Sequence, residues 1–263
     1  MTQYNNKTIT LTFGDAGENH VGMEKIGEVC KDSEVFSCED LRKISLDSDC
    51  QTEYHDLSLD DQNEAGFLIL RGYFKDLEND LFNQLQQLKW DSQYYDTRRN
   101  RVLNKHARHN LLFAKGVERE SDYVNKKGSI VDINSIDSLK ILNERLEKSI
   151  NKCTKSKKGS NLICEGNLYF EKKCGIGYHG DAERKKTIGC RIGESMNLHF
   201  QWFIKHKPID PDTLHYSYVL NSGDVYIMSS KAVGNDWKKS SIPTLRHAGG
   251  HDSYTSLNKY LKA

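Results

Sequence analysis

Residues 174–184 read Cys174-Gly175-Ile176-Gly177-Tyr178-His179-Gly180-Asp181-Ala182-Glu183-Arg184, and the rest of the chain can be interpreted outward from them. The segment has strand character, and side chains two residues apart on a strand project from the same face. His179 and Asp181 can therefore reach one point in space. With a second histidine from a distant strand they would form the two-histidine, one-carboxylate set that binds iron(II) and leaves coordination positions open. A loop histidine hydrogen-bonded to a nearby aspartate is the alternative.

Length and composition limit the possible functions. The chain has 263 residues and a formal net charge of +1, so it can bury a full core, and any basic surface must be local. Seven cysteines without a C-x-x-C pair argue against a disulfide framework or a structural zinc site. We find no apolar run near 18 residues and no signal-peptide pattern. We therefore expect a soluble, intracellular protein of the cytoplasm or nucleus, without a membrane partner.

The N-terminal quarter reads as a separate unit. Thr8 to Phe13 alternates polar and apolar residues, which predicts a strand. A short helix is predicted from Asn19 to Ile26, and another from Ser37 to Ile44 with Ser37 as its N-cap. The acidic stretch 45–64 indicates a linker. We therefore expect residues 1–62 to be an N-terminal extension of unknown role, and residues 63–263 to form the main domain.

The main domain begins with helices and continues with strands. A strand is predicted at 66–73, followed by helices over 75–90 and 137–150 with leucines at helical spacing. From residue 162 onward, short strands alternate with turns and have no helices between them, which excludes a parallel doubly wound sheet. The predicted fold is α+β and mainly β, a sandwich or jelly roll supported by N-terminal helices.

A basic segment lies between the two predicted helices, from Tyr94 to His109. Its cations are interleaved with tyrosines and histidines, a combination that suits phosphates and stacked bases. The cations that we expect to contact substrate are Arg98, Arg99, Arg101 and Arg108. A solvated basic loop is the alternative.

The second half of the chain resembles the iron(II)- and 2-oxoglutarate-dependent dioxygenases, and among them the AlkB-type nucleic-acid oxygenases. Asn167-Leu168-Tyr169 resembles the family's Asn-x-Tyr strand, whose two side chains bind 2-oxoglutarate. Gly175 to Asp181 resembles its metal strand, and Glu183 lies where the family carries an acidic residue that contacts the target base. Gly223 to Met228 resembles the strand before the second metal histidine. The resemblance covers about 64–250 and implies a double-stranded β-helix, or jelly roll.

Two positions of the family pattern have to be assigned. We expect the second metal histidine to be His247, which lies in the better strand context, with His251 as the alternative. Lys238 and Lys239 stand where the family often has this residue, just after Asp-Trp, so we infer a local insertion before His247. The family's arginines beyond that histidine are missing here. Since a buried carboxylate needs a fixed cation, we expect Arg191 to bind the distal carboxylate of 2-oxoglutarate. Lys259 is the other candidate, and Lys262 is the remaining cation after His247.

The resemblance implies an oxygenase that couples decarboxylation of 2-oxoglutarate by O2 to hydroxylation of a C–H bond. His179, Asp181 and His247 would hold Fe(II), and Asn167, Tyr169 and Arg191 would hold the cosubstrate. Tyr178 and Glu183 would read an alkylated base of DNA or RNA, whose oxidative demethylation releases formaldehyde, as in DNA repair. Hydroxylation of a protein side chain and a non-catalytic binding module are the alternative functions.

Overall fold

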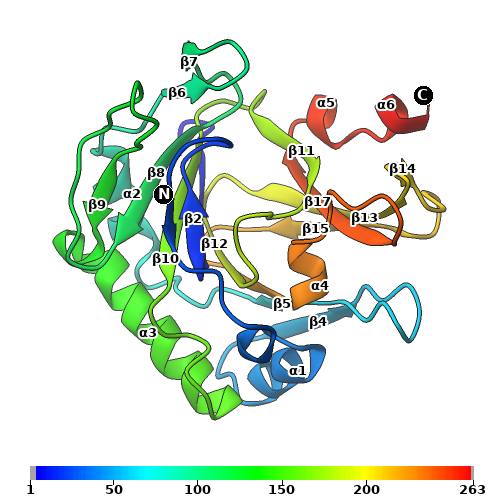
Figure 1. Cartoon of the computed structure of the whole chain (residues 1–263). Helices are drawn as coiled ribbons and strands as arrows, with labels where there is room; N and C mark the ends of the chain where they lie inside the picture. Colours follow the sequence, from blue (N-terminus) through cyan, green and yellow to red (C-terminus); the bar gives the residue numbers. More distant parts are fainter. Residues whose placement is uncertain (1–3, 262–263) are drawn as a thin grey trace.

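Two β-sheets face each other in the computed structural model of the protein, which describes residues 4–261 (Figure 1). The larger sheet has the strand order β4 (Thr52–Asp56), β5 (Gly66–Leu70), β16 (Val225–Met228), β12 (Thr187–Gly193), β1 (Thr8–Gly14), β10 (Ile163–Tyr169), β8 (His109–Ala114) and β9 (Ile130–Asp132). Its neighbours are antiparallel except for β8 and β9. The protein is therefore mainly β, as predicted.

The smaller sheet has the order β11 (Gly175–His179), β17 (Thr244–Gly250), β13 (Met196–Ile204) and β14 (Lys207–Pro208), and β15 (His215–Leu220) also pairs with β13. Two hairpins stand apart from the sheets. They are β2 (Ala16–Glu18) with β3 (Lys25–Gly27), and β6 (Gln93–Asp96) with β7 (Arg101–Asn104). The second hairpin lies within the basic segment that was recognised in the sequence.

Helices cover the outer face of the larger sheet. These are α1 (Cys38–Leu46), α2 (Glu78–Gln86) and α3 (Asp137–Thr154), as Figure 1 shows. Shorter helical segments are η1 (Asp32–Glu34), η2 (Ile133–Ser135), α4 (Ser230–Val233), α5 (Asp252–Thr255) and α6 (Asn258–Leu261). The predicted cap of α1 is present, since the backbone N–H of Asp40 donates to Ser37 Oγ at 3.1 Å. Among residues 4–261, the structure contains no helix with the length and apolar character needed to cross a membrane.

Strand alternation divides the larger sheet into an apolar face and a polar face. In β1, Ile9, Leu11 and Phe13 belong to the core under the helices, whereas Thr10 and Thr12 line a cavity between the sheets. The same division holds in β12, where Ile188, Cys190 and Ile192 pack in the core and Thr187 and Arg191 line the cavity. Because successive side chains of a strand point to opposite faces, a two-residue polar repeat in each central strand produces a polar cavity wall.

The position of β1 contradicts the domain boundary that was expected at residue 62. This strand lies at the centre of the larger sheet, paired with β10 from Thr8 to Gly14 on one side and with β12 from Thr8 to Phe13 on the other. The acidic stretch taken for a linker contains β4, which pairs with β5 along its whole length. The N-terminal residues described here are therefore part of the same sheet as the rest of the chain.

The helix expected from Asn19 to Ile26 is also wrong. These residues form the turn and second strand of the β2–β3 hairpin. Gly22 in the turn has a φ of +89°, a conformation that no right-handed helix contains. The apolar residues of the segment are too few to make a helical face, so the turn conformation decides its structure.

Candidate metal centre

The two histidines of the centre come from neighbouring strands of the smaller sheet. His179 is the last residue of β11 and stands directly opposite His247 of β17. Asp181 follows two residues later, and its backbone N–H donates to the carbonyl of Val233 at 3.0 Å. Gly180 permits this approach, because a Cβ there would lie 2.1 Å from the Gly234 carbonyl oxygen. The chain thus turns tightly against the end of α4 and directs Asp181 back toward the histidines.

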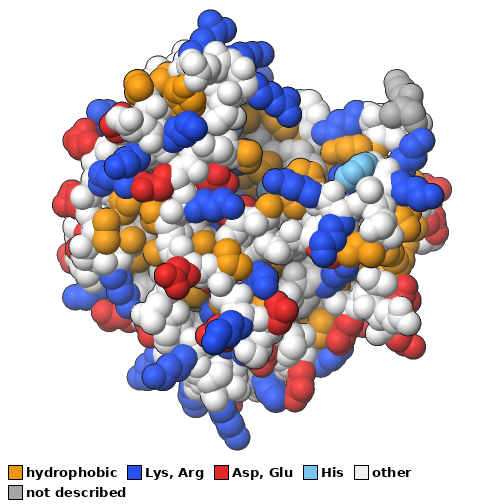
Figure 2. Space-filling model, viewed as in Figure 1, with side chains coloured by type: hydrophobic (Ala, Val, Ile, Leu, Met, Phe, Trp, Pro, Cys, Tyr) orange, Lys and Arg blue, Asp and Glu red, His pale blue; other side chains and the backbone are white. Residues whose placement is uncertain are grey.

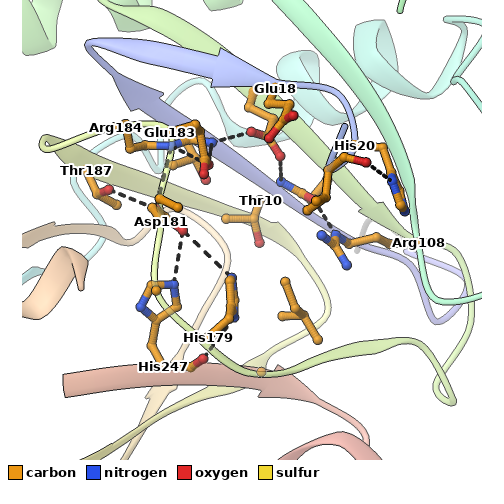
Figure 3. Close-up of a pocket in the computed structure, with 18 of the residues that line it drawn as sticks. Thr10, Glu18, His20, Arg108, His179, Asp181, Glu183, Arg184, Thr187 and His247 are labelled. Carbon is orange, nitrogen blue, oxygen red and sulfur yellow. Dashed lines mark hydrogen bonds and ion pairs between the residues drawn. The ribbon is translucent and has the colours of Figure 1, made fainter. Parts of the chain in front are cut away.

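The three side chains converge on one point (Figure 3). One ligand atom from each of His179, Asp181 and His247 lies within 4.8 Å of the others. Asp181 Oδ1 is 3.7 Å from His179 Nε2 and 3.4 Å from His247 Nε2. The three residues can therefore hold a metal ion, and such a set covers one side of the ion and leaves the other side open.

The orientation of His179 suits a metal ligand. Its Nδ1 lies 2.8 Å from the Gly177 carbonyl oxygen and 3.0 Å from the His247 carbonyl oxygen, so Nδ1 must carry the proton. Nε2 is then left with its lone pair directed at the centre. Burial, followed by the neighbouring His247, lowers the pKa of His179 to about 3. The imidazole is therefore neutral near pH 7, as metal binding requires.

Asp181 is held by two side chains on its second oxygen. Thr187 Oγ1 donates to Oδ2 at 3.2 Å, and Arg184 Nε lies 3.6 Å from the same atom. Burial by itself would raise the pKa of the Asp181 carboxyl, but Arg184 and the two imidazoles together hold that pKa below its usual range. Oδ1 remains free to bind a metal. Neither Thr187 nor Arg184 was singled out in the sequence.

Arg184 is buried and contacts several carboxylates. Its side chain also pairs with Glu165 of β10 and with Glu183, whose Oε1 is 2.7 Å from Arg184 Nη2. Burial opposes the charge of the guanidinium, but the three carboxylates that it contacts raise its pKa. Burial also raises the pKa of Glu183. Three carboxylates share one cation here, so this wall of the cavity is rich in hydrogen-bond acceptors.

The metal centre opens into a cavity of about 680 Å³ between the two sheets. Asn167, Tyr169 and Arg191, the residues predicted to bind a cosubstrate, all line it. Arg191 is 1% exposed, and its Nη1 donates to Thr10 Oγ1 at 2.7 Å. Within residues 4–261, Arg191 Nε has no hydrogen-bond partner and the Arg191 side chain forms no ion pair. Burial lowers the pKa of this guanidinium.

Asn167 joins the cavity wall to the basic segment. Its Oδ1 accepts from Arg108 Nε at 2.6 Å and from Asn110 Nδ2 at 2.8 Å, and its Nδ2 donates to Glu165 Oε1 at 3.2 Å. Arg108 therefore points into the cavity, as Figure 3 shows, rather than outward from a loop. The guanidinium of Arg108 is a second cation in the same cavity as Arg191.

The other predicted residues divide into two groups. Glu183 and Arg98 line the cavity, whereas Arg99 and Arg101 are exposed and are not among the lining residues. Tyr178 faces away from it, with its hydroxyl 2.9 Å from His215 Nε2. This follows from strand alternation, because Tyr178 adjoins His179 in β11.

The alternative residues lie elsewhere. His251 is exposed at the N-cap of α5 and takes no part in the three-residue cluster. Lys259 is exposed, with its Nζ 5.0 Å from the centre of the Tyr260 ring, and does not line the cavity. Lys262 lies outside the described residues. The structure thus favours His247 and Arg191 over their alternatives.

Some cavity residues could have been found from the sequence. Glu165 precedes Asn167 by two residues in the same strand, so the rule that placed His179 beside Asp181 applies to it also. Glu18, Trp237 and Tyr226 line the cavity too, but they come from a hairpin, a loop and a distant strand. Only the folded chain brings these three together.

Comparison with known proteins identifies a viral relative. The chain is 39% identical over 262 residues to the uncharacterized protein R156 of Acanthamoeba polyphaga mimivirus, across 94% of this chain and 97% of the relative. The chain belongs to the R156 family. No model of a described protein family matches it. The match with R156 extends over nearly the whole of both chains, so the family shares more than the segment around the metal centre.

Proposed function

We propose that the protein is an Fe(II)- and 2-oxoglutarate-dependent dioxygenase whose two facing sheets form a double-stranded β-helix. We further propose that it resembles the AlkB-type enzymes in acting on an alkylated nucleobase of DNA or RNA, which it hydroxylates or oxidatively demethylates. The observation that carries the proposal is the buried Arg191, which forms no ion pair with any residue from 4 to 261 and lines the same cavity as the cluster of His179, Asp181 and His247.

A buried guanidinium without a carboxylate partner is costly, so its presence in a cavity wall indicates an anionic ligand. The cosubstrate 2-oxoglutarate has two carboxylates, of which the distal one needs such a cation. Arg191 supplies it, with Thr10 as a neighbouring hydroxyl. Tyr169 and Tyr226 line the same cavity as Arg191.

The residues of the metal centre and of the cavity wall would then have separate roles. His179, Asp181 and His247 would hold the iron, which when bound supplies the coupling of O2 and 2-oxoglutarate to C–H hydroxylation. Thr187 and Arg184 fix Asp181 Oδ2 and leave Oδ1 for the metal. Arg108 and Asn110 donate hydrogen bonds to Asn167 Oδ1 and so fix the orientation of the Asn167 side-chain amide in the cavity wall. Glu183 and Glu165 accept hydrogen bonds on the wall where a base would enter.

The test combines turnover with cosubstrate binding. The protein is loaded anaerobically with Fe(II), exposed to O2, and assayed for succinate from 2-oxoglutarate with and without methylated single-stranded DNA and RNA. Turnover that His179→Ala abolishes and that a methylated oligonucleotide stimulates is expected. Succinate formation that no nucleic acid affects would instead indicate a protein substrate.

Binding of 2-oxoglutarate to the Mn(II)-loaded protein tests the anion site separately by calorimetry. Arg191→Gln should weaken binding by about 10–100-fold, since hydrogen bonds to charged groups contribute about 1.5–3 kcal/mol. Lys259→Gln is the matched control and should bind as the unaltered protein does. If the folded, metal-loaded protein neither binds nor turns over 2-oxoglutarate, the enzyme proposal is refuted and a binding module remains.

A further inference from the structure

Cations gather at the cavity mouth. Four side chains that line the cavity, Lys25, Arg98, Arg108 and Lys238, form no ion pair within residues 4–261. They come from β3, the β6–β7 turn, the segment before β8 and the loop after α4. Lys25, Arg98 and Lys238 are exposed. In Figure 2 the surface is hollowed between the sheets, with Lys and Arg side chains around the hollow.

Of the arginines that do not line the cavity, Arg42, Arg71, Arg119 and Arg145 form ion pairs, whereas within residues 4–261 Arg99, Arg101 and Arg246 form none. Arg71 pairs with Glu53 and Asp224, and Arg145 pairs with Asp76 at 2.7 Å. Acidic residues are as abundant as basic ones, at 37 against 38 in the whole sequence. Because the two kinds of charge are so nearly balanced, four cations from separate segments at one mouth favour a polyanionic ligand there.

Aromatic groups lie beside these cations. The His20 and Tyr94 rings stack with centroids 3.6 Å apart, and His20 lines the cavity. Trp237, next to Lys238, also lines the cavity, and its buried indole N–H has no partner among the described residues. Cations combined with aromatic side chains are the common means of binding single-stranded nucleic acid.

The deeper wall distinguishes a nucleic acid from an acidic peptide. Glu18, Glu165 and Glu183 line the cavity, and Glu165 and Glu183 share Arg184 as their cation. An acidic side chain entering between them would meet like charges. A nucleobase is uncharged or cationic and presents N–H donors, while its phosphates stay outside at the cationic mouth. Cations at the rim therefore match the phosphate of a nucleotide, and carboxylates in the interior match its base.

We infer that a single strand of nucleic acid crosses the cavity mouth, with phosphates bound by Arg98 on the β6–β7 turn and by Lys238 on the loop after α4, so that the site receives an internal nucleotide of a strand. This inference rests on the proposed function for its substrate class and adds Lys238 as a residue that positions the strand. Strand binding needs neither the metal nor the cosubstrate, so it can be tested apart from the chemistry.

Fluorescence anisotropy with a labelled single-stranded octanucleotide tests the inference on the whole protein in EDTA, between 50 and 200 mM NaCl. Each phosphate contact contributes about 0.7 to the slope of log K against log salt for single strands. Lys238→Gln and Arg98→Gln should each reduce that slope by about 0.7, and the double variant by about 1.4. Lys239→Gln is the matched control, an exposed neighbour of equal charge outside the cavity lining, and should leave the slope unchanged.

Three results would overturn the inference. They are absence of oligonucleotide binding, an equal loss of slope in Lys238→Gln and Lys239→Gln, and displacement of the octanucleotide by polyglutamate at equal charge concentration. The last result would indicate an acidic protein partner. Strand binding without 2-oxoglutarate turnover would refute the proposed chemistry alone, and turnover without strand binding would refute this inference alone.

Discussion

Two buried arginines of the cavity stand in opposite electrostatic situations. Arg184 contacts three carboxylates, one of which is Asp181 of the candidate metal centre, whereas Arg191 contacts Thr10 and forms no ion pair within residues 4–261. The first is neutralised within the protein, so it orients side chains that are already present. The second is not neutralised, so it is suited to a ligand. The distinction follows from the partners and could not be made from residue type.

The hydrogen bond from Thr187 to Asp181 should set the metal affinity. Thr187→Val keeps the shape of this buried side chain and removes the donor to Asp181 Oδ2, which then becomes free to rotate. Partners of metal ligands typically contribute 10–100-fold to affinity. We expect Mn(II) binding, measured by calorimetry, to weaken by about 10-fold. Thr12→Val, which alters the same cavity wall away from the triad, should bind Mn(II) normally, and equal affinities in all three proteins would contradict the prediction.

His179 should make the metal-free protein sensitive to acid. Its pKa is about 3 in the folded state, below the usual value of 6.5, so folding favours the neutral imidazole. The resulting stability is complete above pH 6.5 and is lost as the pH falls toward 3. Between pH 6.5 and pH 5 the loss is about 2 kcal/mol, at 1.36 kcal/mol per pH unit.

Urea unfolding at pH 7.5 and pH 5 measures this loss. His179→Gln lacks the titrating group, so its free energy of unfolding should fall less than that of the unaltered protein, by about 2 kcal/mol. His251→Gln, at an exposed position, should behave as the unaltered protein does. The same pH dependence in His179→Gln would show that other groups are responsible.

At the scale of elements, the close packing of β12 against β16 positions Arg191. Gly189 pairs with Tyr226, and the Tyr226 ring lies across the position where a side chain would start. A Cβ at Gly189 would be 1.9 Å from Cζ of that ring. The glycine therefore lets Tyr226 lie flat over β12, beside Arg191 two residues further along. A strand glycine in this position marks a close approach.

Gly189→Ala should destabilise the protein by about 3 kcal/mol, because the ring must move into a packed core. In Gly189→Ala/Tyr226→Ala the overlap is gone, so the combined loss in free energy of unfolding should be smaller than the sum of the two single losses. Denaturant unfolding of the unaltered protein, the two single variants and the double variant measures this coupling as a double-mutant cycle. Additive losses would mean that Gly189 acts through something other than the ring.

At the scale of the whole molecule, the N-terminal strand completes the sheet that carries the site. β1 separates β10, which bears Asn167 and Tyr169, from β12, which bears Thr187 and Arg191. Thr10 of β1 is also the hydrogen-bond partner of Arg191. The spacing between these two groups of cavity residues is therefore fixed by a strand from the N-terminal end of the chain.

Residues 63–263 should not fold by themselves. Without β1, the facing edges of β10 and β12 lose their backbone hydrogen bonds, and Ile9, Leu11 and Phe13 leave the core. Such losses exceed the usual stability of a domain, about 5–15 kcal/mol. Circular dichroism of this fragment should show no cooperative thermal transition, while the full chain shows one. A cooperative transition in the fragment would restore the boundary at residue 62.

The sequence by itself determined the elements whose pattern is local. The period of two in β1 and the caps of α1 depend on neighbours a few residues apart, so they could be read directly. The same reasoning placed His179 and Asp181 together and turned Arg191 away from Cys190 and Ile192, toward the cavity. Side-chain direction along a strand is a property of the chain itself.

Only the tertiary structure decided which distant segments meet. It placed β1 between β10 and β12, brought His247 opposite His179, and gathered Arg98, Arg108 and Lys238 at one mouth. It also stacked His20, in the hairpin that residues 19–26 help to form, on Tyr94 of another hairpin. Which strands pair and which loops meet depends on contacts between residues far apart in the chain. Local sequence patterns do not predict these contacts.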